Sequence, residues 1–230
     1  PGTKAVCLQH GLGKEEQHYV VPSGMDIAKF QSAKVDDWRK LINPEQLATK
    51  HPQFIAFVGS YEPRKRHLEL LPLFAEVVKA CPDAVLLFLG EGENEAKIWA
   101  KITELHLEQH VLMLGFQPNV EAYLAISQLG ILPSAREGLA RVVIQYVLAG
   151  LPVVCTNTPG VNLIAKDGEN ALIAPVDDIT PMQQQIITVL QDEALRKRMS
   201  NASRAQDLSQ WGIDHMVNSI ETIYQKYAKV

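Results

Sequence analysis

The stretch from Pro133 to Val154 reads PSAREGLARVVIQYVLAGLPVV, and it decides the fold class. An apolar run at 129–132 ends directly before it, a helical pattern occupies 139–149, and a second apolar run covers 152–156. Apolar runs without polar alternation are typical of strands buried on both faces, as in a parallel sheet. We therefore interpret this stretch as the loop, helix and strand of one right-handed βαβ crossover.

The same alternation extends along most of the chain. Continuous apolar runs that predict buried strands lie at 54–58, 84–89, 110–114, 129–132, 152–156 and 171–174. Helical patterns lie between or after them at 67–81, 95–107, 119–127, 139–149, 181–190, 193–206 and 212–228. This order predicts an α/β fold with a doubly wound parallel sheet, Rossmann-like in its architecture.

The first 52 residues carry a weaker pattern. Residues 19–22 are predicted as a short strand that stops at the turn 23–26, and a short helix is expected from about Asn43 to Ala48. The histidines at positions 67 and 106 fall in helical patterns without an obvious partner. We expect both of them on helix surfaces.

Composition excludes several classes of protein. The 230 residues are 47% hydrophobic and 21% charged, which suits a globular chain with a well-buried core. A net charge of -4 argues against a nucleic-acid partner, because such proteins usually present a basic face. No apolar stretch approaches the roughly 20 residues that span a bilayer.

Cysteine usage favours a reducing compartment. The chain has three cysteines, an odd number, and they are far apart: Cys7, Cys81 and Cys155. We expect reduced structural thiols and a cytoplasmic location. No pair of these cysteines has the spacing of a zinc site.

Ligands of open α/β sheets bind beyond the carboxyl ends of the strands, so the loops after the strands carry most of the information. The first such loop, 59–66, combines a glycine, a helix start and the consecutive cations Arg64, Lys65 and Arg66. Free backbone N–H groups and adjacent cations suit a diphosphate, although a solvated basic helix start fits the loop equally well. The glycines of a second loop, 90–93, permit close approach of a ligand, but a plain turn is favoured there.

The loop before the helix of the opening stretch is a second candidate. If that helix begins near Gly138, its first amides can hold a phosphate, with Glu137 just outside. Gln145 follows eight residues after Glu137, so it lines up near the same helix face. Helix capping by Ser134 or Glu137 is the simpler explanation on spacing alone.

These residues resemble the C-terminal, donor-binding domain of the retaining, nucleotide-sugar-dependent glycosyltransferases with the GT-B fold, the family-4-like group called glycosyl transferases group 1. The family pattern reads roughly P-S-x-x-E-G-F-G-x-x-x-x-E-A-x-x-x-G-x-P-V-V, and the opening stretch follows it. Further motifs agree in order and spacing: Val20–Asp26 with Phe30, Val58-Gly59 with Lys65, Leu89–Gly92, Leu114–Phe116 and Lys166–Asn170. The resemblance covers about residues 19–228.

The resemblance implies roles for individual residues. Lys65 and Glu137 would be catalytic: Lys65 would bind the donor diphosphate and stabilise the leaving group, and Glu137 would contact hydroxyls of the donor sugar. The amides of Leu139 and Ala140 would bind phosphate, and Phe116 would lie near the base. The full set of implied donor-binding residues is Gly59, Ser60, Arg64, Gly90, Phe116, Gln117, Gly138, Leu139, Ala140, Arg141 and Gln145.

Two of the departures from the family pattern change the charge of the site. Ser60 replaces the usual arginine, so Arg64, Arg66 or Arg141 would have to supply that charge. Gln145 stands where a glutamate usually holds the ribose hydroxyls; an amide still forms hydrogen bonds but loses the negative charge.

The resemblance also implies a domain organisation and an activity. Residues 1–30 would be the end of an N-terminal acceptor domain and the interdomain strand, and 31–52 a connecting segment. Residues 53–206 would bind the donor, and 207–230 would form a helix packing back towards the acceptor domain. The donor would be a UDP- or GDP-linked sugar, transferred with retention to a glycan or lipid-linked acceptor in bacterial polysaccharide or lipopolysaccharide synthesis.

The implied enzyme needs no metal or other cofactor and no nucleic acid, and the whole protein would have peripheral contact with the inner face of the membrane. The chain by itself is expected to bind the donor weakly and to transfer nothing. A non-catalytic nucleotide-sugar-binding or scaffolding module of a polysaccharide assembly complex is one alternative. An epimerase or phosphorylase of the same architecture is another.

Overall fold

The structure, a computed structural model, describes the backbone of residues 2–228 and the side chains of residues 4–228. Six parallel strands form one sheet in the order β3-β2-β1-β4-β5-β6. Their bounds are β1 Gln53–Val58, β2 Ala84–Leu89, β3 Val111–Met113, β4 Ser127–Leu132, β5 Val153–Thr156 and β6 Ala171–Ala174. The chain builds outward from β1 in one direction and from β4 in the other, so the topological switch point lies between these two strands.

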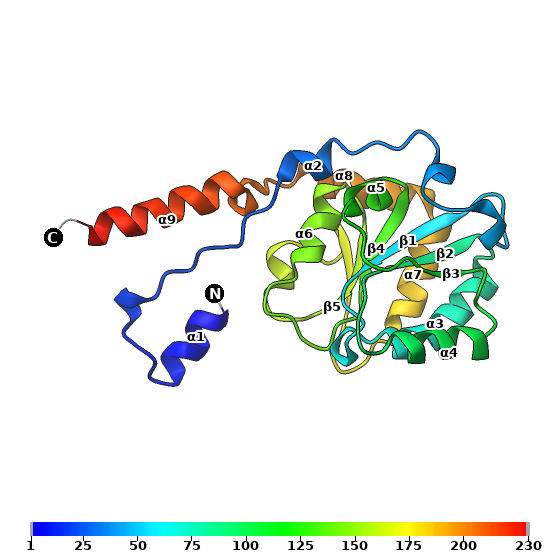
Figure 1. Ribbon diagram of the computed structural model, residues 1–230, viewed down its shortest axis with the longest axis horizontal. Coiled ribbons are helices and arrows are strands. Elements are labelled where there is room, and N and C mark those ends of the chain that lie inside the picture. Colours follow the sequence, from blue (N-terminus) through cyan, green and yellow to red (C-terminus); the bar gives the residue numbers. More distant parts are fainter. Residues whose placement is uncertain (1, 229–230) are drawn as a thin grey trace.

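Helices lie on both faces of this sheet (Figure 1). Those of the sheet domain are α3 His67–Ala80, α4 Glu95–Glu104, α5 Val120–Ala125, α6 Arg141–Leu148, α7 Pro181–Gln191 and α8 Glu193–Ala205. Residues of β1 contribute to two apolar clusters: Phe57 packs in the cluster of α3, and Phe54 in the cluster that includes Tyr123 of α5. Every residue of β2 is buried, which explains its uninterrupted apolar sequence.

The six strands and the helices of the sheet domain therefore confirm the predicted fold class. Two expectations outside this domain are wrong. Residues 19–22 form no strand, because no neighbouring strand lies beside them among residues 2–228, and Val20 is exposed. The expected helix near residue 44 is only the 3-10 turn Pro44–Gln46, which the side chain of Asn43 caps.

The two ends of the described chain extend away from the sheet domain on the same side (Figure 1). They comprise α1 Gly2–Gln9, the 3-10 turn Glu15–Gln17, the short helix α2 Ile27–Gln31 and the last helix, α9 Ile213–Tyr227. The two segments meet where the Met25 N–H donates to the Trp211 carbonyl at 2.9 Å. Gly24 is needed at this crossing, because a Cβ there would lie 2.7 Å from the Cα of Ile213.

Candidate functional site

The candidate site lies at the carboxyl ends of β1 and β4, on either side of the switch point. The loop 59–66 follows β1 and the loop 133–140 follows β4. A backbone hydrogen bond of 2.8 Å from the Ala135 N–H to the Arg64 carbonyl ties the two loops together. Two segments distant in the sequence thus form one wall, in the crevice where open α/β sheets bind ligands.

The local backbone turns Lys65 inward. Pro63 begins a 3-10 turn that ends at Lys65, and Arg66 adopts a left-handed conformation with φ 59° before α3 begins. The stem of Lys65 then lies over Gly59, where a Cβ would come within 3.4 Å of Lys65 Cε. Gly59 therefore leaves room for this side chain, and Lys65 is only 7% exposed.

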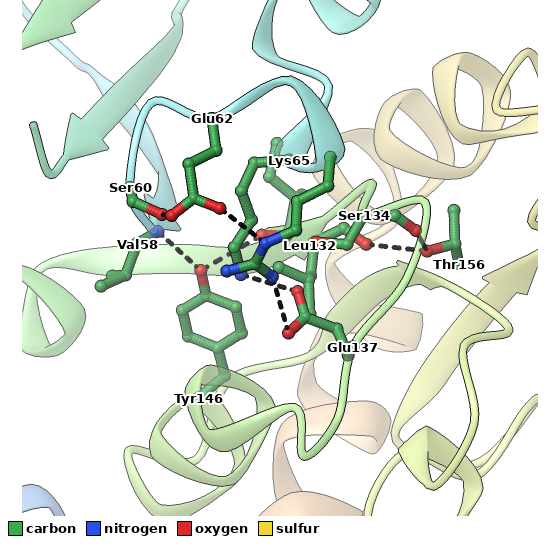
Figure 2. Close-up of polar contacts among 11 residues, drawn as sticks. Val58, Ser60, Glu62, Lys65, Leu132, Ser134, Glu137, Tyr146 and Thr156 are labelled. Atoms are coloured by element: carbon green, nitrogen blue, oxygen red, sulfur yellow. Dashed lines mark hydrogen bonds and ion pairs between the residues drawn. The ribbon is translucent and has the colours of Figure 1, made fainter. Parts of the chain in front are cut away.

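Lys65 and Glu137 form a buried ion pair (Figure 2). The distance from Lys65 Nζ to Glu137 Oε1 is 2.6 Å, and the two side chains are 9% and 7% exposed. Lys65 and Glu137, which were predicted to be catalytic, are therefore brought together. A charge-assisted hydrogen bond of this kind is strong because water is excluded from both charges.

Arg64 extends this pair into a chain of alternating charges. Its guanidinium lies 3.4 Å from Glu137 Oε2 and donates through Nε to Glu62 Oε2 at 2.6 Å. Ser60 donates its hydroxyl to the other Glu62 oxygen at 2.6 Å. The hydrogen bonds from Ser60 and then Arg64 lower the pKa of Glu62 below its usual value. Two cations thus meet at the Glu137 carboxylate, and an anionic ligand would suit both.

Of the three arginines considered as replacements for the missing family arginine, only Arg64 lies at this pair. Arg66 turns away, and its guanidinium donates to the Val176 carbonyl at 2.5 Å. Arg141 reaches the carbonyl of Gly24 at 3.5 Å, beside the crossing of the terminal segments. Lys65 and Arg66 are consecutive, but their side chains point in different directions because Arg66 has a left-handed backbone. The sequence alone did not reveal this.

The condition for a phosphate site on the helix amides, a helix that begins near Gly138, is not met, because α6 begins at Arg141 with Ala140 as its N-cap. Gly138 is a poor helix former, and no side chain caps the helix. The amides of Leu139 and Ala140 therefore belong to a loop, and they donate to no described protein acceptor. Gly138 and Leu139 line a cavity of about 420 Å³ together with Trp211 and residues of the N-terminal segment.

The remaining predicted donor-binding residues have mixed surroundings. Phe116 is 70% exposed, and its N–H donates to Glu91 Oε1 at 3.1 Å. Gln117 is engaged within its own loop, since it donates to the Leu114 carbonyl at 2.6 Å and accepts from the Tyr123 hydroxyl at 3.1 Å.

Two further predicted residues differ in how the fold uses them. Gly90 is required by packing, because a Cβ there would lie 2.0 Å from the Gly59 carbonyl oxygen. Gln145, on α6, is half-buried, and its side chain forms no hydrogen bond with another described residue.

Several buried polar side chains lie near the site without a ligand-binding role predicted from the sequence. Thr156 donates to the Ser134 carbonyl at 2.6 Å at the ends of β5 and β4 (Figure 2). The hydroxyls of Ser134 and Thr158 are buried without a hydrogen-bond partner in the described chain. Tyr146 is fully buried, and the sequence predicts only that it lies on a helix. Its hydroxyl, on the apolar face of that predicted helix, was the one feature in the sequence that could have indicated a buried polar contact.

The expected surface position of His67 is also wrong, because this side chain is only 2% exposed. His106, by contrast, is exposed. Among residues 2–228, no group of three or more His, Cys, Asp or Glu residues could hold a metal ion. Within the same residues, no helix is long and apolar enough to cross a membrane.

Comparisons with known proteins agree with this architecture. A family model described as "Glycosyl transferases group 1" matches residues 39–206. The chain is 30% identical over 222 residues to the N-acetyl-alpha-D-glucosaminyl L-malate synthase of Bacillus anthracis, an alignment that covers 95% of this chain and 58% of that protein. It is 27% identical over 231 residues to the UDP-Gal:alpha-D-GlcNAc-diphosphoundecaprenol alpha-1,3-galactosyltransferase of Escherichia coli, covering 96% of this chain and 57% of that protein.

Solved structures show the same fold. Anabaena Alr3699/HepE in complex with UDP-glucose matches with a TM-score of 0.81 at 22% identity, covering 99% of this chain and 61% of that chain. WaaG, a glycosyltransferase involved in lipopolysaccharide biosynthesis, matches with a TM-score of 0.78 at 18% identity, covering 92% and 59%. The chain thus spans less than two thirds of the length of these relatives.

Proposed function

Since this chain belongs to the glycosyl transferases group 1, and has the fold of the C-terminal half of a GT-B enzyme, we propose that it binds a nucleoside-diphosphate sugar. The observation that carries the proposal is the buried Lys65–Glu137 pair with Arg64 beside it, at the switch point of the sheet. The Anabaena structure holds UDP-glucose, and the Escherichia coli relative is named for a UDP-Gal donor. Both support a UDP-linked sugar as the ligand, and a GDP-linked sugar is kept as the other form of the proposed donor.

In this proposal the two cations leave Glu137 for the donor. Lys65 and Arg64 hold the diphosphate oxygens and stabilise the negative charge that develops on the leaving nucleoside diphosphate. Glu137, released from its ion pair, accepts hydrogen bonds from hydroxyls of the sugar. The unengaged amides of Leu139 and Ala140 donate to phosphate, and the transfer proceeds with retention and without a metal or cofactor.

The acceptor is proposed to bind in a longer protein, through a domain N-terminal to this one. The curated relatives are longer than this chain, and α9 supplies a surface for such a domain. No residue of α9 is buried, and its exposed apolar residues recur at helical spacing along one side: Ile213, Val217, Ile220, Tyr224 and Tyr227. The acceptor is proposed to be a glycan or lipid-linked sugar of bacterial polysaccharide or lipopolysaccharide synthesis, reached at the cytoplasmic face of the membrane.

Calorimetric titration with UDP, GDP and their sugars tests the proposed ligand. We expect weak, saturable binding of one nucleoside diphosphate and its sugar to this chain, without sugar transfer to water or to added glycans. If none of these ligands binds, the proposal is wrong and a purely structural module is favoured.

A second candidate is a non-catalytic nucleotide-sugar module. It is favoured by the side chain of Gln145, which forms no hydrogen bond with another described residue, and by the hydroxyl of Ser60, which donates to Glu62. Absence of turnover by the full-length protein would identify that second candidate.

Arg64 is expected to provide the second charge of the diphosphate site. Replacing Arg64 with glutamine removes one charge-assisted hydrogen bond, so affinity for the nucleoside diphosphate should fall about tenfold. The matched control is Arg66→Gln, because Arg66 is adjacent but donates to the Val176 carbonyl. Calorimetry on both variants measures the effect. Equal affinities of the Arg64 and Arg66 variants would show that Arg64 does not contact the diphosphate.

A further inference from the structure

The ladder between β1 and β4 ends before either strand does. β1 pairs with β2 as far as Val58, opposite Leu89, and β4 pairs with β5 as far as Leu132. Between β1 and β4, however, the last paired residues are Ala56 and Gly130. The two central strands therefore separate at their carboxyl ends, which is where the candidate site begins.

The hydroxyl of Tyr146 fills this gap (Figure 2). It accepts a hydrogen bond from the Val58 N–H at 2.9 Å and donates one to the Ile131 carbonyl at 3.1 Å. The Gly130 N–H bonds to Pro152 on the β5 side, so the backbone groups of Ile131 face β1. If the parallel pairing of β1 and β4 continued, the Val58 N–H would therefore donate directly to the Ile131 carbonyl. Two hydrogen bonds in series, through the phenol oxygen, replace that single bond.

The fold makes room for the ring that carries this hydroxyl. Tyr146 lies on α6 and is fully buried, and its ring packs against Gly130 of β4. A Cβ at Gly130 would lie 2.4 Å from Tyr146 Cγ, so a larger residue there would displace the ring. Burial raises the pKa of the Tyr146 phenol, which keeps it a neutral donor. The family pattern has alanine at this position, which has no hydroxyl to insert between strands.

We propose that the Tyr146 hydroxyl is a wedge between β1 and β4 that sets the separation of the loops carrying Lys65 and Glu137. Tyr146 is a positioning residue in this inference, and its role in donor affinity rests on the proposed function. Gly59 follows Val58 directly, and Pro133 lies two residues beyond Ile131, so a change in strand spacing reaches both loops at once. Small misplacements of binding groups are costly, because the charges must match the diphosphate oxygens closely.

Tyr146→Phe tests the wedge while keeping the ring over Gly130. We expect the variant to fold, a direct hydrogen bond from the Val58 N–H to the Ile131 carbonyl to form, and the affinity for UDP to fall about tenfold. The matched control is Ser203→Ala, which also removes a buried hydroxyl, here one on α8 that donates to the Leu151 carbonyl at 2.7 Å. The control should bind UDP as the unaltered chain does.

Two measurements separate the possible failures. A crystal structure of Tyr146→Phe reports the spacing of β1 and β4, and unchanged spacing without the direct bond overturns the wedge. Calorimetry with UDP measures the effect on donor affinity. Equal affinity of Tyr146→Phe and the unaltered chain, or an equal loss of affinity in Ser203→Ala, overturns the positioning role. If the unaltered chain binds neither UDP nor GDP, the proposed function is wrong, and the positioning role is wrong with it. The strand spacing in the crystal structure of Tyr146→Phe still shows whether the hydroxyl separates β1 from β4.

Discussion

Replacing Lys65 with methionine is expected to lower the free energy of unfolding by about 3–5 kcal/mol at pH 7, because it removes the nearest cation from a buried carboxylate. Glu137 is 7% exposed and Lys65 Nζ is its nearest cation, at 2.6 Å, whereas Arg64 lies at 3.4 Å. The same change should abolish binding of the nucleoside diphosphate. Urea unfolding gives the stability and calorimetry gives the affinity.

A double variant separates the structural part of this prediction from the functional part. Lys65→Met combined with Glu137→Leu replaces the buried pair by apolar side chains of similar size, and such replacements are often neutral or stabilising. We therefore expect the double variant to recover the stability of the unaltered chain but not its affinity for nucleotide. If the single variant loses less than about 1 kcal/mol in its free energy of unfolding, the ion pair contributes only as much as a solvated surface pair. That result would contradict the burial of this ion pair.

The sheet could be predicted because burial on both faces leaves a direct trace in the sequence. β2, buried at each of its residues from Ala84 to Leu89, is the plainest case. The predicted strand at 19–22 failed because an apolar segment needs a neighbouring edge before it can pair, and a local pattern does not supply one. The helix start at Arg141 was missed for a related reason: without a capping side chain, the boundary depends on the conformation of Gly138 and Leu139.

The candidate site was predictable in its residues but not in its contacts. Lys65 and Glu137 were marked by a resemblance, yet their pairing joins positions 72 residues apart. It depends on the place between β1 and β4 where the order of the strands switches sides. The choice between Arg64 and Arg66 depends on one left-handed residue. Tyr146 belongs to an apolar helix face in the sequence, and only the positions of β1 and β4 reveal its hydroxyl between them.

His67 makes stability sensitive to acid, because it is buried in a cage of aromatic rings. Its ring stacks on Phe57 at 4.2 Å and meets the edges of Phe88 and Tyr61 at 4.9 and 5.1 Å. Neither ring nitrogen has a hydrogen-bond partner in the described chain. Burial, and then the charge of Lys65, lower the pKa of His67 from 6.5 to about 3.

The sign of the effect follows from proton uptake. Between pH 6.5 and pH 3 the unfolded chain protonates this histidine while the folded chain does not, so stability falls as the pH falls through this range. Above pH 6.5 both states are neutral at this residue, and its contribution no longer changes. From pH 7 to pH 5 the loss attributable to His67 is about 2 kcal/mol, at 1.36 kcal/mol for each unit between 6.5 and 5.

His67→Phe should therefore be more stable than the unaltered chain, and increasingly so in acid. Phenylalanine keeps the stacking and removes two unsatisfied nitrogens, which we expect to stabilise the fold by about 1–2 kcal/mol at pH 7. The difference should widen by about 2 kcal/mol at pH 5, measured by urea unfolding at both pH values. His51→Phe, at an exposed histidine, is the control and should leave the pH dependence unchanged. Parallel stability curves for the unaltered chain and His67→Phe between pH 5 and 7 would mean that His67 takes up its proton in the folded state. That result would contradict the lowered pKa of the buried ring.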